Sequence, residues 1–473
     1  MHTDLHDTES PVLIKADVCI IGAGPAGITT AVKLAEKGKQ VVLCEGGGLR
    51  ATNESQATYD GEVIGDNYFP LTSTRLRFFG GSTNHWGGYC RIFDEIDFSR
   101  DYLSESFVWP IERKEIDPYL QEACDILEIS DNWNDQVIDK KHGVQTVDFK
   151  FSPPVRFLHK YFDAVKQNKN IHAYTNANLI KLNATEGLAE EASFNGFSNG
   201  SLQVKANVFV FAMGGIENSR QLLWNAQIND GHLCSDELPI GRYWMEHPHY
   251  TLGQAVVDSS IVENPFYSLT ATAQRELGIL NCGLRVAKNP KEKTNELIND
   301  LLCKAPTIGR RVEKLASMDL VCGAELRAAW EQAPAYDNRI ALSAAKKDQF
   351  GIPLTEIHWK KRPEERVTIS KTLERFDQFL RNQDFGRVRL DDWLYYQHDY
   401  PKNDEQAGHH HMGGTRMSSS ATYGVVDSNC QVFGSKNLFI AGSSIFTTGG
   451  HNNPTLPIVQ FSLRLADFLS QPG

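Results

Sequence analysis

The sequence predicts an α/β fold, and three segments carry that prediction. The first, residues 16–47, reads ADVCIIGAGPAGITTAVKLAEKGKQVVLCEGG. The second, at 206–226, is an apolar run followed by a glycine pair and a helical pattern, and the third, at 437–469, repeats that arrangement. Each segment is expected to be a buried strand leading into a helix, which is the repeating unit of a parallel sheet.

The first segment has the full strand–turn–helix–strand context. Residues 16–21 are apolar on both faces, as expected of a buried parallel strand. A helix is expected over 28–37, with Ala31, Leu34 and Ala35 on one face, and a second strand over 40–44. This context separates a functional glycine turn from a chance glycine-rich loop.

Three glycines with G-x-G-x-x-G spacing lie in this turn. Gly22 allows the tight turn, Gly24 lets a pyrophosphate approach the backbone, and Gly27 lets the helix pack closely on the strand. The helix N-terminus offers free N–H groups to the phosphates. Glu45 ends the second strand, where it can accept hydrogen bonds from an adenosine ribose. The segment therefore predicts dinucleotide binding, although the motif alone does not distinguish FAD from NAD.

The late strand at 437–444 predicts a discontinuous cofactor domain, because it returns to a sheet begun near the N-terminus. We expect this domain to comprise 11–100, 202–250 and 405–473. The insertions, 101–201 in part and 251–404, are expected to form a second, substrate-binding domain. A surface hairpin is expected at 183–201, which is rich in Asn, Gly, Ser and Glu.

Composition excludes several classes of protein. The 473 residues include 48 basic and 59 acidic side chains, for a formal charge of −11, and no dense Lys/Arg run, so nucleic acid and anionic membranes are not expected partners. No apolar run approaches the ~20 residues of a spanning helix. The nine cysteines form no C-x-x-C pair, so they are expected to be reduced. The polar start of the chain shows no export pattern, so we expect a cytoplasmic protein, and a homo-oligomer is compatible with the sequence.

Further motifs follow in a specific order. They are GGSTNHWGG at 80–88, WPIERKEIDPYL at 109–120, GGIENSRQLL at 214–223, IGRYWMEHP at 240–248, HHHMGGTRM at 409–417 and NLFIAGSS at 437–444. Together with the N-terminal turn and the C-terminal helix, they resemble the glucose–methanol–choline (GMC) family of FAD-dependent oxidoreductases. The His-Trp pair at 85–86 resembles the branch that contains pyranose oxidase and the sugar and sugar-acid dehydrogenases, although Asn84 replaces the smaller residue expected beside that histidine. This resemblance implies FAD, a Rossmann-type FAD-binding domain interleaved with an α+β substrate domain on an antiparallel sheet, and an alcohol as electron donor.

The resemblance also implies which residues contact the flavin cofactor. They are Gly22, Gly24, Pro25, Ala26, Gly27, Glu45, Gly46, Gly80, Gly81, Ser82, Asn84, His85, Trp86, Gly87, Ala212, Gly214, Gly442, Ser443, Asn453, Pro454 and Thr455. For His85 two interpretations stay open: a covalent bond to the 8α carbon of the flavin, as in that branch, or simple contact with the ring. Trp86 is expected either to pack in the interior or to form a wall of the flavin site.

Three adjacent histidines at 409–411 raise the question of which one is functional. Neighbours in an extended segment point to opposite faces, so we expect no metal site there. The family places its active-site histidine seven residues before a methionine, which gives His410 counted from Met417, with His411 as the alternative. Its second active-site residue precedes the proline of an Asn-Pro pair, which gives Asn453 rather than the nearby His451.

This pair suits alcohol oxidation. An imidazole can accept the hydroxyl proton, and an amide can donate a hydrogen bond to the developing alkoxide while hydride passes to flavin N5. The sequence thus predicts an oxidoreductase acting on a primary or secondary alcohol of sugar-like type, with oxygen or an unknown acceptor. Alternatives are a flavin monooxygenase, a non-redox family member such as a lyase or scaffold, and a dehydrogenase subunit that passes electrons to a partner. The Glu-His-Pro stretch at 246–248 is interpreted as a structural turn.

Overall fold

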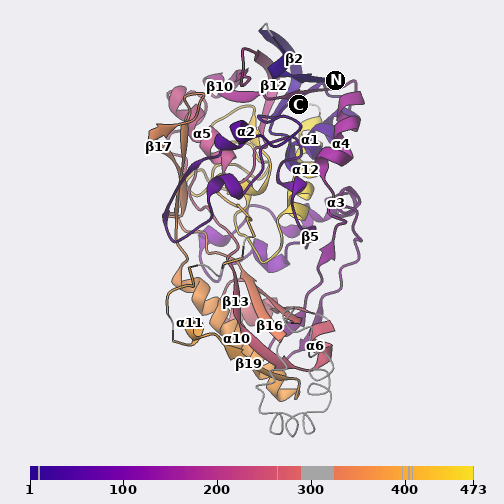
Figure 1. The fold of residues 1–473 in the computed structure, drawn as a ribbon, viewed down its shortest axis with the longest axis vertical. Coiled ribbons are helices and arrows are strands. Elements are labelled where there is room, and N and C mark those ends of the chain that lie inside the picture. Colours follow the sequence, from indigo (N-terminus) through magenta and orange to yellow (C-terminus); the bar gives the residue numbers. More distant parts are fainter. Residues whose placement is uncertain are drawn as a thin grey trace.

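The computed structural model describes residues 1–8, 11–263, 265–288, 324–396, 398–402, 405–406 and 408–471. The molecule is elongated, with two ends built from different secondary structure (Figure 1). One end, near both termini, contains β2 (Val12–Ile21), β12 (Ser201–Phe211), α1 (Pro25–Glu36) and α12 (Thr455–Ser470). The other contains β13 (His249–Val257), β16 (Ala324–Trp330), β19 (Gly386–Leu390) and α10 (Pro363–Asn382).

The larger sheet has the strand order β1–β9–β3–β2–β12–β11–β10, with β20 paired to β12. Its other strands are β1 (His2–Asp4), β3 (Val41–Cys44), β9 (Ile171–Thr175), β10 (Asn178–Thr185), β11 (Leu188–Asn195) and β20 (Leu438–Ile440). The pairs from β1 to β12 and the β12–β20 pair are parallel, whereas β11 is antiparallel to β12 and to β10. The predicted parallel α/β unit is therefore confirmed.

Four parallel strands end level with one another. Ile21 of β2 lies opposite Cys44 of β3 and Phe211 of β12, and Phe211 lies opposite Ile440 of β20. The carboxyl ends of these strands therefore form one edge of the sheet. In open α/β sheets, ligands bind beyond that edge.

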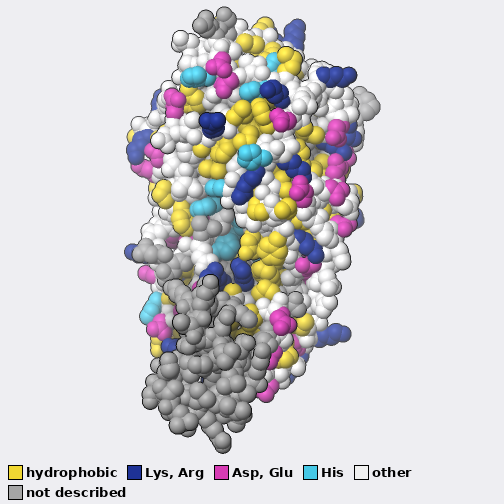
Figure 2. Space-filling model, turned by 45° about the vertical axis from the view of Figure 1, so that its right-hand side comes forward, with side chains coloured by type: hydrophobic (Ala, Val, Ile, Leu, Met, Phe, Trp, Pro, Cys, Tyr) yellow, Lys and Arg dark blue, Asp and Glu magenta, His cyan; other side chains and the backbone are white. Residues whose placement is uncertain are grey.

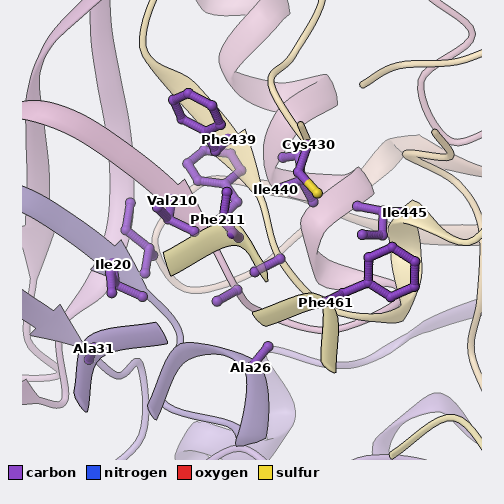
Figure 3. Packing of buried hydrophobic residues seen from close by; sticks show 14 of the residues in the cluster. Ile20, Ala26, Ala31, Val210, Phe211, Cys430, Phe439, Ile440, Ile445 and Phe461 are labelled. Carbon is purple, nitrogen blue, oxygen red and sulfur yellow. The ribbon is translucent and has the colours of Figure 1, made fainter. Parts of the chain in front are cut away.

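The core beneath this edge is apolar and closely packed. Figure 3 shows Ala31 of α1 near Ile20, Ala26 in another part of the same helix, and Phe461 of α12 near Ile445. All five of these side chains are at most 4% exposed. The alanines let α1 approach the sheet, which explains why the strand–helix unit forms where the sequence predicts it. The helix starts at Pro25, three residues before the predicted start, because proline suits the first helical turn.

The second sheet has the order β19–β13–β16–β15–β14–β7–β6, and every neighbouring pair is antiparallel. Its remaining strands are β6 (Gln136–Asp139), β7 (Val144–Thr146), β14 (Phe266–Leu269) and β15 (Cys282–Lys288). One face packs on α10, through a buried cluster that includes Leu252, Val286, Leu326, Phe376 and Leu380. The antiparallel sheet implied by the family resemblance is thus present, and its other face is free to line a cavity.

Smaller elements complete the part of the chain that the structure describes. A third sheet has the order β17–β18–β4, and β5 pairs with β8. These strands are β4 (Gly61–Gly65), β5 (Tyr89–Cys90), β8 (Lys150–Phe151), β17 (Arg339–Lys347) and β18 (Pro353–Trp359). The other helices are α2 (Asn53–Ala57), α3 (Leu120–Leu127), α4 (Phe157–Gln167), α5 (Glu217–Ile228), α6 (Ser259–Glu263), α7 (Ala271–Leu277) and α11 (Asp392–Tyr395). Within the described ranges, no helix is both long and apolar enough to cross a membrane.

Two details refine the sequence-based expectations. The segment 183–201 does contain a hairpin turn, but it also includes β11, whose Ala192 and Phe194 are buried in the larger sheet. The small polar residues around them hid this strand from the pattern. The division into cofactor and substrate domains stays a prediction, and β9, β10 and β11 add residues 171–195 to the larger sheet.

Candidate active site

A cavity of about 730 Å³ lies between the carboxyl edge of the larger sheet and the second sheet. Residues one or two positions after the four level strand ends line it: Gly22, Glu45, Ala212 and Gly442. From the other side it is lined by residues of β13, β14, β15 and β16. The cavity therefore joins the predicted cofactor edge to the antiparallel sheet.

The glycine turn fits a bound dinucleotide. Gly22 has a φ of +107°, and a Cβ there would lie 2.4 Å from the carbonyl oxygen of Ala212. A Cβ on Gly27 would lie 1.9 Å from the carbonyl oxygen of Gly22, so helix and turn pack too closely for any side chain. Gly24, in contrast, faces the cavity, with nothing within 4 Å of its Cβ position. It precedes α1 without a side-chain cap, which leaves N–H groups of the first helical turn for a phosphate.

Glu45 already has a structural task at this edge. Its carboxylate accepts hydrogen bonds of 2.9 Å from the backbone N–H groups of Ala23 and Gly47. These bonds tie the loops after β2 and β3 together. Glu45 also lines the cavity, so the remaining lone pairs of its oxygens can accept from ribose hydroxyls, as predicted.

Most of the predicted cofactor contacts line this one cavity. They are Gly22, Gly24, Pro25, Ala26, Glu45, Gly46, Gly81, Ser82, His85, Trp86, Gly87, Ala212, Gly214, Gly442, Ser443, Asn453, Pro454 and Thr455. Gly27, Gly80 and Asn84 do not line it. Gly80 donates its N–H to Ala23 at 2.7 Å, and the Asn84 amide donates to Phe79 at 2.9 Å, so both brace the loop from behind.

The loop that carries His85 is fixed by a neighbouring arginine. The Arg156 guanidinium donates to the backbone oxygens of Thr83 and Trp86, at 3.0 and 2.8 Å. Trp86 is partly buried, donates from its indole N–H to Val155 and lines the cavity, and its role as a wall of the flavin site stays a prediction. Partial burial and then Arg156 lower the pKa of His85, which favours its neutral form.

His410 and Asn453 meet in the cavity wall. The Nδ2 of Asn453 lies 3.0 Å from Nε2 of His410, and both residues line the cavity. On its other side, Nδ1 of His410 lies 2.9 Å from Nδ1 of His247. The Nε2 of His247 lies 3.2 Å from the carbonyl oxygen of Gly449.

The hydrogen-bond partners determine where the protons are. A carbonyl only accepts, so His247 must carry its hydrogen on Nε2, and burial lowers the pKa of His247 to about 3, which keeps it neutral. Its Nδ1 is then an acceptor, so His410 must donate from Nδ1. This leaves an unprotonated Nε2 on His410, which accepts from the Asn453 amide and faces the cavity.

The pKa of His410 lies well below the ordinary value of 6.5. Burial is the main cause, and the neighbouring His247 and His249 add to it. The imidazole expected to accept the hydroxyl proton is therefore a weaker base than a free histidine. Its ring bonds to another neutral imidazole and not to a carboxylate, so this partner supplies no negative charge to offset the effect of burial.

Glu246 and Tyr68 support the histidine segment, and sequence reasoning missed both roles. Glu246 accepts from the backbone N–H groups of His247 and His410, and it receives a hydrogen bond from the Tyr68 hydroxyl. Tyr68 also lies 3.0 Å from Nε2 of His411, which is therefore held behind His410. The stretch at 246–248 is thus more than the predicted turn. Its appearance among the family-like motifs was the available signal, but nothing in its spacing indicated a contact with residues more than 160 positions away.

The third histidine of the triplet, His409, lines the cavity beside an aromatic ring. Its φ is +52°, and its ring contacts Phe69 edge-on at a centroid distance of 5.0 Å. Ligand atoms of Glu246, His409 and His411 lie within 4.8 Å of one another, which is close enough to be tested for a metal ion. Two of these groups already bond to Tyr68, so the expectation of no metal stays a prediction.

His451 also lies in the cavity wall, although it was set aside in favour of Asn453. Its Nε2 lies 3.2 Å from both the Asp94 carboxylate and the Arg91 guanidinium. Among the described residues, its Nδ1 has no hydrogen-bond partner. A Cβ at position 283 would lie 2.6 Å from that nitrogen, so His451 abuts Gly283 of the second sheet.

Known proteins are similar to this chain along most of its length. Residues 17–214 match a family model described as FAD dependent oxidoreductase, and residues 334–462 match one described as GMC oxidoreductase. A 2-methyl-1,2-propanediol dehydrogenase from Mycolicibacterium austroafricanum is 24% identical over 97% of this chain and 95% of its own length. The large subunit of a fructose dehydrogenase from Gluconobacter japonicus is 27% identical, over 56% of this chain and 48% of its own length.

The fold is also found among solved structures. A pyridoxine 4-oxidase from Mesorbium loti superposes with a TM-score of 0.59 and 16% identity, covering 96% of this chain and 98% of its own. A formate oxidase gives a TM-score of 0.55 with the same coverage and 15% identity. The family models and the named relatives lead to one conclusion. The chain contains an FAD-dependent oxidoreductase domain and a GMC oxidoreductase domain, and it is an FAD-dependent oxidoreductase acting on CH–OH groups.

Proposed function

We propose that the protein oxidises a primary or secondary alcohol of sugar-like type, with His410 as the general base. The observation that carries this proposal is the 3.0 Å contact between His410 and Asn453 in the cavity wall. The hydrogen bond from His410 to His247, which itself donates to the carbonyl oxygen of Gly449, fixes the tautomer of His410. A substrate hydroxyl that comes between the two side chains would replace their direct hydrogen bond, donating to Nε2 of His410 and accepting from Nδ2 of Asn453. Bound FAD supplies the hydride acceptor, N5 of its flavin ring.

The two side chains divide the work on the substrate oxygen. As the proton moves to His410, positive charge spreads to Nδ1, whose hydrogen bond to His247 then strengthens. Asn453 does not titrate, so its amide remains a donor to the alkoxide throughout. Because His410 is a weak base, stabilisation of the alkoxide by Asn453 carries a large share of the barrier reduction.

The relatives support the substrate class and leave the electron acceptor open. Both curated relatives are named dehydrogenases of hydroxyl compounds, a diol and a sugar. One of them is the large subunit of an assembly, which supports the alternative that this chain passes electrons to a partner protein. Reoxidation of the reduced protein by oxygen, compared with reoxidation by a soluble dye, distinguishes an oxidase from a dehydrogenase.

For His85, covalent attachment and simple contact both remain open proposals. Its position in the cavity wall and its lowered pKa suit either a nucleophilic imidazole or a hydrogen-bonding one. Acid precipitation decides between them. A yellow pellet that becomes colourless in His85→Ala supports the bond, whereas a colourless wild-type pellet excludes it.

Anaerobic titration tests the proposed function directly. The purified flavoprotein is mixed with a panel of polyols, sugars and simple alcohols while the oxidised flavin band is followed. At least one member should bleach the flavin with formation of the matching carbonyl compound. A flavin that no alcohol reduces would favour the non-redox lyase or scaffold alternative.

A further inference from the structure

The cavity wall opposite the cofactor edge is formed by residues of β15 and β16. They are Gly283, Leu284, Arg285, Arg327, Ala328 and Ala329. Leu284 and Ala328, like Val286 and Leu326, belong to the cluster packed on α10. Because side chains alternate between the faces of a strand, Arg285 and Arg327 share the other face with Gly283 and Ala329.

The register of the sheet places two guanidinium groups opposite each other. Arg285 of β15 pairs directly with Arg327 of β16. Like charges at directly opposite positions destabilise a sheet, so the fold itself gives no reason for this pair. Arg327 forms an ion pair with Glu325, whose other oxygen accepts from Thr251 at 2.8 Å.

Among the residues that the structure describes, Arg285 has no such compensation. It donates to the hydroxyl of Tyr89 at 3.2 Å and lies over the ring of Phe266, with its guanidinium carbon 5.5 Å from the ring centroid. Within the described ranges, no carboxylate lies within 4.0 Å of it. The Nε atoms of both arginines are buried and without a hydrogen-bond partner among the described residues. The cavity lining therefore includes two guanidiniums, and the only one that forms an ion pair among the described residues is that of Arg327.

The arginine pair lies close to the proposed base, His410. Two residues further along the strands, His249, Ala329 and Gly283 lie side by side on three neighbouring strands and form the next row of residues on the same face of the sheet. The ring of His249 meets that of His410 edge-on, at 5.6 Å between ring centroids, and Gly283 abuts His451. Two residues along a strand span about 7 Å, so the arginines lie about that far from the row next to His410.

The intervening row leaves room for a substrate. Gly283 and Ala329 carry little or no side chain on the cavity side. On the face in Figure 2, histidine side chains lie near mid-height and Lys or Arg side chains lie just below them. A carbon chain could therefore run from the histidines to the arginines across Gly283 and Ala329.

We propose that the substrate is an anionic alcohol whose carboxylate or phosphate binds between Arg285 and Arg327 while its CH–OH group lies at His410 and Asn453. This rests on the proposed function and adds the substrate class to it. A guanidinium binds an oxyanion through paired, charge-assisted hydrogen bonds, which would satisfy the unpartnered Nε atoms. The spacing suits a chain of roughly six carbons between the two groups.

A binding experiment tests the anion site without catalysis. The flavin-loaded protein is titrated calorimetrically with hexanoate and with hexanamide, neither of which carries a hydroxyl group to oxidise. Hexanoate should bind wild type about 10-fold or more tightly than hexanamide, and Arg285→Gln should remove that preference. Arg387→Gln is the matched control, because Arg387 is an exposed residue of β19 in the same sheet. Equal binding of the two probes to wild type would overturn the proposal.

A kinetic experiment identifies the anion. Anaerobic flavin reduction is measured with 6-hydroxyhexanoate, 6-hydroxyhexyl phosphate and 6-hydroxyhexanamide. In wild type, kcat/KM should be about 10- to 100-fold higher for the favoured anion than for the amide. This preference should be lost in Arg285→Gln and partly kept in Arg285→Lys. The faster of the two anions identifies carboxylate or phosphate.

The two proposals fail in different ways. If the amide reduces the flavin as fast as both anions, the anion site is wrong although the proposed function stands. If no alcohol of any kind reduces the flavin, the proposed function fails, and the hexanoate titration still decides whether the anion site exists. Flavin content of each variant shows that it is folded before it is compared.

Discussion

The two sides of the cavity are built differently. On the cofactor side, strands end level at Ile21, Cys44, Phe211 and Ile440, and the turns that follow present glycines and backbone N–H groups. On the other side, side chains of β15 and β16 line the cavity, and no residue of these two strands has a positive φ. Recognition by backbone requires glycine at fixed spacing and so leaves a motif, whereas recognition by side chains on a sheet face leaves none.

The largest expected effect is the loss of flavin binding on the cofactor side of the cavity. It is tested at two glycines whose Cβ positions have opposite surroundings. Gly27→Ala places a Cβ 1.9 Å from a backbone oxygen, so we expect no folded flavoprotein. Gly24→Ala meets no protein atom within 4 Å and should fold normally, but its methyl group occupies the phosphate approach. Flavin absorbance relative to protein, with circular dichroism for folding, separates the two. A flavin-replete Gly27→Ala protein would contradict the packing argument.

The next effect concerns which member of the histidine triplet is the base. His410→Ala should slow flavin reduction by about 10²–10⁴-fold while the bound-flavin spectrum persists. His409→Ala and His411→Ala serve as controls, since neither ring contacts Asn453 among the hydrogen bonds of the described residues. Stopped-flow reduction under anaerobic conditions provides the rates. A greater loss in His411→Ala would move the assignment by one residue.

A smaller effect tests the fixed tautomer. His247→Phe leaves Nδ1 of His410 as a buried donor without an acceptor, so reduction should slow by about 10-fold or more. His247→Gln retains an acceptor oxygen and should recover part of the rate. Equal rates in both variants and wild type would show that His247 does not orient the base.

The pH dependence of the wild type follows from the depressed pKa. Because His410 is neutral above a pKa that lies well below 6.5, the rate of flavin reduction should be level near neutrality. It should fall only when acid protonates Nε2, at pH values well below 6.5. Stopped-flow reduction rates across this range provide the check. A rate that keeps rising through pH 7 and above would mean that another group with a higher pKa controls the reaction.

The smallest effect is one of stability, on the substrate side. Glu365 in α10 is buried and accepts from Trp330 at 3.0 Å, and burial raises its pKa to about 7 from 4.5. Because its carboxyl pKa is raised, the folded state binds more protons than the unfolded state in this pH range. The contribution of Glu365 to the free energy of unfolding therefore falls as pH rises from 4.5 to about 7. Between pH 5 and pH 8, the free energy of unfolding measured with denaturant should fall less in Glu365→Gln than in wild type. The expected difference between the two falls is roughly 2 kcal/mol. Parallel pH profiles for the two proteins would show that Glu365 does not titrate in this way.

The same difference between the two sides explains which parts of the fold and of the site could be predicted from the sequence. The strand–helix units after Ile21 and Phe211 and the glycine turn are local, and their patterns placed them correctly. The support of His410 by Glu246, His247 and Tyr68 joins segments far apart in the chain, and no local pattern describes such a contact. The arginine pair likewise depends on strand register, because Arg285 and Arg327 become neighbours only when β15 and β16 pair. Composition alone showed no preference for a charged substrate, since both signs are mixed in that part of the sequence.

The hydrogen bonds that join His410 to His247 and His247 to Gly449 affect how a proton can leave the site. They end on the carbonyl oxygen of Gly449, which can accept a hydrogen bond but not keep a proton. With His410 as the base, a proton taken up at Nε2 has no exit through His247 to the far side of the protein. It must leave by the route on which it arrived, through the cavity that the product occupies. Proton release to solvent would then wait for product departure, so the two events would share one rate constant at each turnover.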